Sequence, residues 1–173
     1  MVRCLILLLA VICSPLVFAD NSASALAIFL KNNFNQQSPQ AQTLWLKPAL
    51  KKRMEQILNH PYQGLRVHYW QSGQRSAWVL DEIGKEQPIT TGIIIEDGKI
   101  IQLEVLAYRE SRGGEVQQRF FTKQFQRAAL TTDDKLTQKI DGITGATLSV
   151  WALQKMARVA LLLDAEKSAA ASR

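Results

Sequence analysis

The stretch PITTGIIIEDGKIIQLEVLAYR, residues 88–109, decides the fold. It contains two runs rich in β-branched residues, Pro88 to Ile95 and Lys99 to Arg109, which are separated by Glu96-Asp97-Gly98. An Asp-Gly pair between such runs is a strong signal for the tight turn of a β-hairpin. The stretch therefore predicts two neighbouring antiparallel strands.

A second pair of strands is predicted just before this hairpin. Apolar residues alternate from Leu65 through Val67 and Tyr69, and a further run covers Ser76 to Leu80. The residues between them, Ser72-Gly73-Gln74-Arg75, have the composition of a hairpin loop. We therefore expect four antiparallel strands in all.

Helical segments flank the predicted sheet. Apolar residues recur at helical spacing in residues 22–34, 48–59 and 147–163. This order of elements predicts an α+β domain with a small antiparallel sheet, N-terminal helices and a C-terminal helix packed across or beside the sheet. We divide the chain into an N-terminal helical segment at 20–64, a domain at 65–165 and a flexible tail at 166–173.

The first 19 residues have the pattern of a secretory signal peptide. Arg3 gives a basic start, an apolar run extends from Leu5 to Ile12, and Val17-Phe18-Ala19 resembles a cleavage site. We expect the mature chain to begin at Asp20 and to reside in the periplasm, free or associated with the outer face of the inner membrane. A retained anchor and a lipid attached at Cys13 are the alternatives.

Few side chains are available for redox or metal chemistry. Both cysteines, Cys4 and Cys13, lie in the predicted signal, so the mature chain would have no thiol. The two histidines, His60 and His68, have no second ligand-type residue at a metal-binding spacing. We predict no metal site, and electron transfer would require a bound organic cofactor.

The charge of the chain is moderately basic. The formal net charge is +6, and removing Arg3 with the predicted signal takes 21 basic residues to 20 against 15 acidic, a net charge of +5. Nucleic-acid binding favours clustered basic residues interleaved with aromatic ones. The one tight cluster, Lys51-Lys52-Arg53, is better explained as the solvated face of a helix. We therefore expect no nucleic-acid partner.

The sequence DGITGATLS, residues 141–149, precedes the last predicted helix and has the features of an anion site. Gly142 and Gly145 allow the backbone to turn without Cβ clashes. The amides that open the helix are unpaired donors at the positive end of its dipole, and Thr147 sits where a bound phosphate would lie. The alternative is that Thr144 is only an N-cap, with Gly145 and Ala146 in the first turn.

This motif resembles the flavinylation motif of the FMN-binding domain family, which includes the C subunit of the sodium-pumping NADH:quinone reductase and the G subunit of the Rnf complex. The resemblance extends over roughly residues 65–163. It implies that a flavin transferase joins FMN through its phosphate to Thr147. Thr144, Gly145, Ala146 and Ser149 would then surround the phosphate, and Asp141 would be a recognition feature.

The segment from Glu104 to Glu115 also resembles this family, in which the loop equivalent to Tyr108–Glu115 lies against the flavin. Glu110 and Ser111 could bond to a flavin edge or a ribityl hydroxyl, and Gly113 and Gly114 would let the backbone approach a flat ring. We expect this loop to line one pocket with Thr147. The alternative is a charged turn with glycines for flexibility.

The resemblance implies a periplasmic flavoprotein that carries electrons between a membrane oxidoreductase and a periplasmic acceptor. Its partners would be the flavin transferase and redox proteins at the membrane or in the periplasm. One alternative is a binding module without redox function. Another is an autonomous reductase, for which no proton-donor set is recognisable. Trp151, one turn beyond Thr147, could stack near the cofactor, but a tryptophan in an apolar stripe is more often a core residue, and we favour the core.

Overall fold

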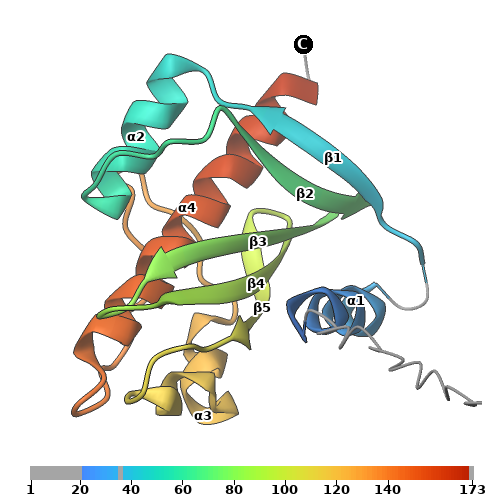
Figure 1. Cartoon of the computed structure of the whole chain (residues 1–173). Coiled ribbons are helices and arrows are strands. Elements are labelled where there is room, and N and C mark those ends of the chain that lie inside the picture. The colour runs from blue at the N-terminus through green and yellow to red at the C-terminus, as the bar shows by residue number, and fades with distance from the viewer. Residues whose placement is uncertain (1–20, 35–36, 172–173) are drawn as a thin grey trace, which may run out of the picture.

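The computed structural model describes residues 21–34 and 37–171. The predicted signal peptide, with both cysteines, lies outside these residues. Figure 1 shows a sheet with helices on more than one side of it. The predicted α+β class with an antiparallel sheet, N-terminal helices and a C-terminal helix is confirmed.

The sheet has five strands in the described residues, in the order β1-β2-β3-β4-β5, and every neighbouring pair is antiparallel. The strands are β1 (Gln40–Trp45), β2 (Arg66–Ser72), β3 (Arg75–Ile83), β4 (Pro88–Glu96) and β5 (Lys99–Ala107). Asp97 and Gly98 join β4 to β5 with φ of +50° and +69°. Two positive φ angles define the type I′ turn that the Asp-Gly pair predicted.

The prediction of four strands is wrong because it omits β1. This strand lies at the edge of the sheet, where five of its six residues are exposed and only Leu44 is half-buried. Its sequence, QAQTLW, therefore shows no alternation of apolar and polar residues. The segment 20–64 is consequently not only helical, since one of its parts pairs with β2.

The α-helices are α1 (Asn21–Asn33), α2 (Pro48–Leu58), α3 (Arg119–Thr122) and α4 (Thr147–Ala171), and η1 (Gly114–Gln117) and η2 (Lys123–Phe125) are short 3₁₀ helices. Helix α2 begins at a proline, which is favourable in the first turn, and ends at Asn59 in the left-handed region. Helix α4 continues eight residues beyond the predicted end at Leu163. The predicted flexible tail thus begins inside a helix.

The sheet carries a core on each face, because strand side chains alternate between faces. Ile89, Ile93 and Ile95 of β4 lie in the main core with α2 and α4. Ile94 lies in a second core with Phe29 and Phe34, at and just after the end of α1. A Cβ atom on Gly92 would lie 2.7 Å from Phe29 Cζ, so this glycine makes room for the α1 side chain.

A buried polar cluster explains why α4 is longer than predicted. Asp164 accepts hydrogen bonds from Ser76 Oγ at 2.6 Å and from Lys167 Nζ at 2.8 Å. Trp78 Nε1 donates to the same Ser76 oxygen at 2.9 Å, and the Trp78 ring stacks on Tyr69. The Asp164 carboxylate thus has a hydrogen-bond partner on β3, and the helical pattern of α4 alone does not reveal this partner.

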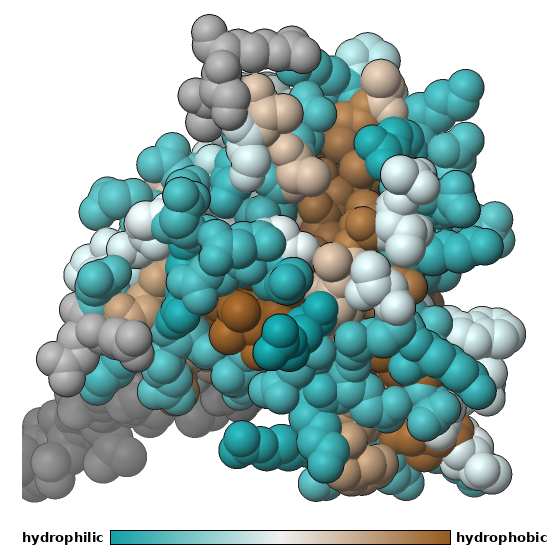
Figure 2. All heavy atoms as spheres, turned by 180° about the vertical axis from the view of Figure 1, so that it is seen from behind, coloured by the Kyte–Doolittle hydropathy of each residue, from teal (hydrophilic) through white to brown (hydrophobic). Residues whose placement is uncertain are grey.

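The reverse face of the molecule is mostly hydrophilic, with a hydrophobic band in its upper part and smaller hydrophobic areas below (Figure 2). Large exposed hydrophobic side chains in the described residues are spread over several elements: Ile28, Trp45, Leu65, Ile83, Ile101, Phe120, Leu148 and Trp151. Two of them, Leu148 and Trp151, lie within one turn of each other at the start of α4. The expectation that Trp151 belongs to the core is therefore wrong, since 55% of its surface is exposed.

Candidate functional site

Helix α4 begins at Thr147, directly after a turn that only glycine adopts easily. Gly145 has φ of +84°, and the first bond of the helical ladder runs from Val150 N to Ala146 O at 2.9 Å. The amides of residues 147–149 precede that bond, so the helix itself does not use them. Thr144 lies before the left-handed residue and cannot cap the helix. The N-cap alternative is therefore wrong.

The residues of the motif differ in exposure. The exposed ones are Asp141, Thr144, Gly145 and Thr147, whereas Ala146 and Ser149 are buried. Asp141 is the one predicted site residue that points elsewhere: its amide donates to Gln124 Oε1 at 2.8 Å, and its carboxylate lies 3.8 Å from Lys139 Nζ. Asp141 lines neither of the clefts described below.

The loop that follows β5 is fastened to the start of α4. Tyr108 Oη donates to Arg112 O at 2.5 Å and lies 3.0 Å from Ser149 Oγ. Gly113 has φ of +83°, and a Cβ atom there would lie 3.2 Å from both Ala146 Cβ and Ser149 Oγ. Gly113 rather than Gly114 is thus the glycine that permits the close approach of the two segments.

Two adjoining clefts lie beside this loop, the first between the loop and the start of α4 and the second between the loop and the turn at Thr144 and Gly145. The first, of about 620 Å³, is lined by Lys85, Glu86, Glu110, Ser111, Arg112 and residues 145–149. The second, of about 670 Å³, is lined by residues 111–115, Gln117, Gln118, Thr144 and Gly145. Each volume is in the range of small-molecule sites. Residues 110–112 line the first cleft together with Thr147, as predicted, whereas Gly113 and Gly114 line only the second cleft, which Thr147 does not line.

Glu110 lines the first cleft and also holds a neighbouring loop in place. Its Oε1 accepts hydrogen bonds from the amides of Lys85, Glu86 and Gln87 at 2.5, 2.7 and 2.9 Å. These bonds, that from Gln87 foremost, hold the pKa of the Glu110 carboxyl below its usual value. Glu110 therefore shapes the 85–87 loop that forms one wall of the first cleft.

Several residues of the clefts were not predicted from the sequence. Arg112 is exposed and lines both clefts, where its guanidinium could pair with a phosphate. Lys85 and Leu148 line the first cleft, and Tyr108 fastens its loop. The glycine pair at 113–114 was a signal for the loop, but no local pattern indicated that residues 85–87 would reach it.

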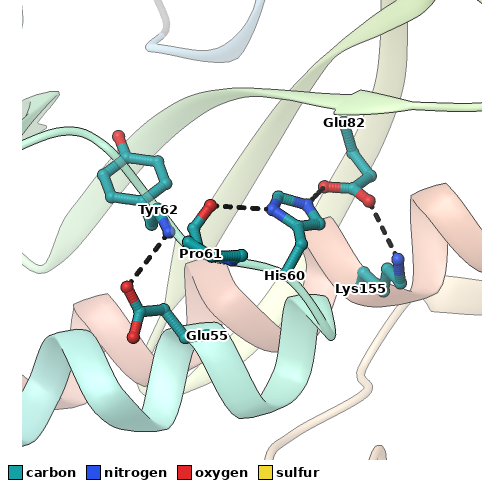
Figure 3. A network of polar contacts seen from close by, with 6 residues as sticks. All are labelled: Glu55, His60, Pro61, Tyr62, Glu82 and Lys155. Carbon is teal, nitrogen blue, oxygen red and sulfur yellow. Dashed lines mark hydrogen bonds and ion pairs between the residues drawn. The ribbon is translucent and has the colours of Figure 1, made fainter.

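A polar network joins α2, β3 and α4 at the middle of α4 (Figure 3). The buried Glu82 carboxylate accepts hydrogen bonds at 2.9 Å from both Lys155 Nζ and His60 Nε2. His60 Nδ1 lies 2.9 Å from Pro61 O, so both ring nitrogens face acceptors. The Pro61 carbonyl and then Glu82 raise the pKa of His60 above its ordinary value.

A smaller cleft of about 270 Å³ lies between β5 and the segment 117–126, away from the motif. Within residues 21–34 and 37–171, no three His, Cys, Asp or Glu side chains are grouped as around a metal ion. No helix in that part of the chain has the length and apolar character needed to cross a membrane. The clefts beside Thr147 are therefore the strongest candidate site.

Comparison with known families supports this choice. Residues 84–162 match the family described as the FMN-binding domain. The match covers β4, β5, the 108–115 loop and α4 up to Leu162, and so includes every residue that lines the two clefts. It begins later than the predicted Leu65. No curated protein matches the chain.

Proposed function

We propose that this chain, in which residues 84–162 match the FMN-binding domain family, carries FMN covalently, through the phosphate, on Thr147. We further propose that it transfers electrons between a membrane oxidoreductase and a periplasmic acceptor. The observation that carries the first proposal is the position of Thr147: an exposed hydroxyl on the first residue of α4, in the wall of a cleft of about 620 Å³.

The residues around this hydroxyl fit a phosphate. The amides of residues 147–149 are free of the helical ladder at the positive end of a 25-residue helix, where anions bind favourably. Arg112 lines the same cleft and supplies a cation. These groups would hold the phosphate, while Ser111 and the backbone at Gly113 would lie beside the rest of the cofactor.

Attachment requires a separate enzyme. In this step Thr147 Oγ1 would bond to the phosphorus nearer the flavin of a phosphoanhydride, the phosphoanhydride bond would break, the outer phosphate would leave as a phosphomonoester, and the hydroxyl proton would pass to a base of the transferase. A threonine hydroxyl is a weak nucleophile without an adjacent base. No hydrogen bond to Thr147 Oγ1 from a base is present in the described residues, so a flavin transferase would supply the activation.

When bound, FMN supplies the transfer of one or two electrons. The chain's own task would be to hold the phosphate at Thr147, to orient the ring against the 110–114 loop, and to leave one edge accessible to partners. A covalent bond suits a protein outside the cytoplasm, where a dissociated cofactor would be lost. The pattern of Arg3, the apolar run and Val17-Phe18-Ala19 supports export. Cell fractionation would test the periplasmic location.

Intact-mass spectrometry tests the attachment. Protein co-expressed with a flavin transferase should gain the mass of one FMN less one water. Thr147→Ala should gain nothing, whereas Thr144→Ala, which alters the other exposed threonine of the motif, should still be modified. An unchanged mass of the parent protein, or flavin on Thr147→Ala, contradicts the proposal. A colourless, unmodified protein would favour a binding module without redox function.

A further inference from the structure

Trp151 is a large aromatic side chain left on the surface beside the proposed attachment point. It is 55% exposed, and none of the ring contacts in the described part of the chain involves it. We propose that Trp151 is the platform on which the isoalloxazine ring stacks. This inference rests on the proposed function, since it assigns a residue of the same cofactor site.

The position of Trp151 on α4 follows from helix geometry. Successive residues turn by about 100°, so a residue four positions after Thr147 lies about 40° around the axis from it and one turn further along. Leu148 lies at about 100°, which places Trp151 between the directions of Thr147 and Leu148. Both of those residues line the first cleft. Trp151 therefore continues the wall of the cleft along α4.

The direction of the side chain favours the same arrangement. Side chains on a helix lean toward its N-terminus, and a residue covers the surface over the preceding turn. The indole of Trp151 is thus expected to lean toward Thr147 and Leu148. Trp151 is the only aromatic residue of α4, so it is the only aromatic partner that this helix offers to a ring tethered at Thr147.

The lining of the first cleft offers little apolar surface for a flavin ring. Its lining is largely polar or charged, with Lys85, Glu86, Glu110, Ser111 and Arg112 on one side. Such groups suit a phosphate and ribityl hydroxyls, whereas a flat tricyclic ring needs apolar surface. Leu148 and Trp151 offer that surface, and stacked aromatic pairs contribute about 0.5–1.5 kcal/mol beyond area burial.

An ion pair lies one turn beyond Trp151 on α4, on the side away from Thr147. Lys155, one turn beyond Trp151, is held at 2.9 Å by the buried Glu82. Glu82 is three residues before Lys85, which lines the first cleft. Along α4, Trp151 therefore lies between the cleft residues 147–149 and the paired Lys155.

Flavin fluorescence tests the contact, because an indole stacked on an excited flavin donates an electron and quenches emission. The full chain is flavinylated and its mass confirms one FMN. Trp151→Leu should then raise flavin fluorescence several-fold. Trp151→Phe should also raise the fluorescence, but it should keep more of the shift in the flavin absorbance spectrum that stacking on an aromatic ring produces. Trp45→Leu is the matched control: Trp45 is 63% exposed but lies on β1, and its loss should change nothing. Far-UV circular dichroism confirms that each variant is folded.

The outcomes separate this inference from the proposed function. Full attachment with equal fluorescence in Trp151→Leu and the parent protein overturns the stacking and leaves attachment intact; the exposed surface would then belong to a protein partner. If no FMN becomes attached, free FMN is titrated into the full chain. Quenching that disappears in Trp151→Leu supports the platform without the covalent bond, and the absence of quenching overturns it.

Discussion

The two ends of α4 differ in how far their side chains are exposed and in whether they have bonding partners within the chain. At its start, Thr147 and Trp151 are exposed beside a cleft. Toward its end, the side chains of Asp164 and Lys167 are only 8% and 10% exposed and form an ion pair, and Asp164 also accepts a hydrogen bond from Ser76. Buried polar groups must find partners within the chain. The difference teaches that an unpartnered, exposed helix end is available for a ligand, whereas a fully bonded end stabilises the fold.

The ends are far enough apart to be tested separately. Thr147 and Asp164 are separated by about 26 Å along the axis, at 1.5 Å per residue. Effects of substitutions at such distances usually add. Changes at the buried end should therefore alter the free energy of unfolding without altering flavin attachment, and a change of the exposed Thr147 side chain should do the reverse.

The largest effect is expected at the buried end. Asp164→Ala leaves Lys167 without its carboxylate and removes the acceptor of Ser76 Oγ. Breaking a buried ion pair by removing one partner costs about 3–5 kcal/mol. Urea unfolding measures this loss. The control is Lys47→Ala, which breaks the exposed Lys47–Glu166 pair nearby and should cost at most about 1 kcal/mol. Equal costs for the two variants would contradict the contrast between buried and exposed pairs.

A smaller effect on stability is expected at the Gly113 contact. Gly113→Val places a branched side chain at φ of +83° and a Cβ atom 2.9 Å from Tyr108 Oη, which should cost about 1–3 kcal/mol. The displaced loop should also change the flavin spectrum while Thr147 is still modified. Gly114→Val is the comparison, since a Cβ atom there meets only the flexible Gln117 amide within 3.4 Å. Intact mass, absorbance and urea unfolding distinguish the two variants; a larger stability loss in Gly114→Val would contradict this prediction.

Local patterns predicted the parts of the fold that depend on neighbouring residues. The Asp97-Gly98 turn and the amphipathic course of α2 follow from a few adjacent side chains. Strand β1 could not be predicted in this way, because an edge strand exposed on both faces has no hydrophobic alternation. The extension of α4 depends on Ser76, which is 88 positions from Asp164. Such partners are known only once the chain is folded.

The candidate site follows the same rule. The glycine-threonine motif and the 110–114 loop were recognisable because their residue types have local mechanical reasons. The core position predicted for Trp151 is wrong, and the bonds that Glu110 makes to residues 85–87 were not predicted. Glu110 is bonded to amides 23 to 25 positions earlier in the chain. Trp151 has the spacing of a core residue, and its exposure depends on which elements cover that side of α4.

The pH dependence of the cleft wall is a test of the exposed end. Because Glu110 has a lowered pKa in the folded protein, its bonds to residues 85–87 stabilise the folded state above the ordinary glutamate pKa. That stabilisation is lost as the pH falls through the lowered value. In ¹⁵N-NMR titrations, the amides of residues 85–87 should shift with a midpoint below the ordinary glutamate pKa, and Glu110→Gln should abolish the shift. A midpoint at or above the ordinary value would contradict the bonding.

The smallest effect is expected between the two ends, at the His60–Glu82–Lys155 network. His60 has a raised pKa in the folded protein, so its bonds stabilise the folded state fully below its unfolded pKa of about 6.5 and are lost as the pH rises through the folded value. The destabilisation by His60→Ala should therefore be larger at acidic than at alkaline pH. Because 44% of the His60 side chain is exposed, the difference should be at most about 1 kcal/mol.

The Pro61 carbonyl contributes more to the raised pKa of His60 than Glu82 does. In Glu82→Gln, the NMR titration of His60 should therefore keep a pKa above the ordinary value, though below that of the parent protein. Flavin attachment should be unaffected in both variants, because neither residue lines the clefts at Thr147. A loss of attachment in His60→Ala would show that the middle of α4 belongs with its exposed start, and the division of the helix into a ligand end and a packing end would then have to move beyond Lys155.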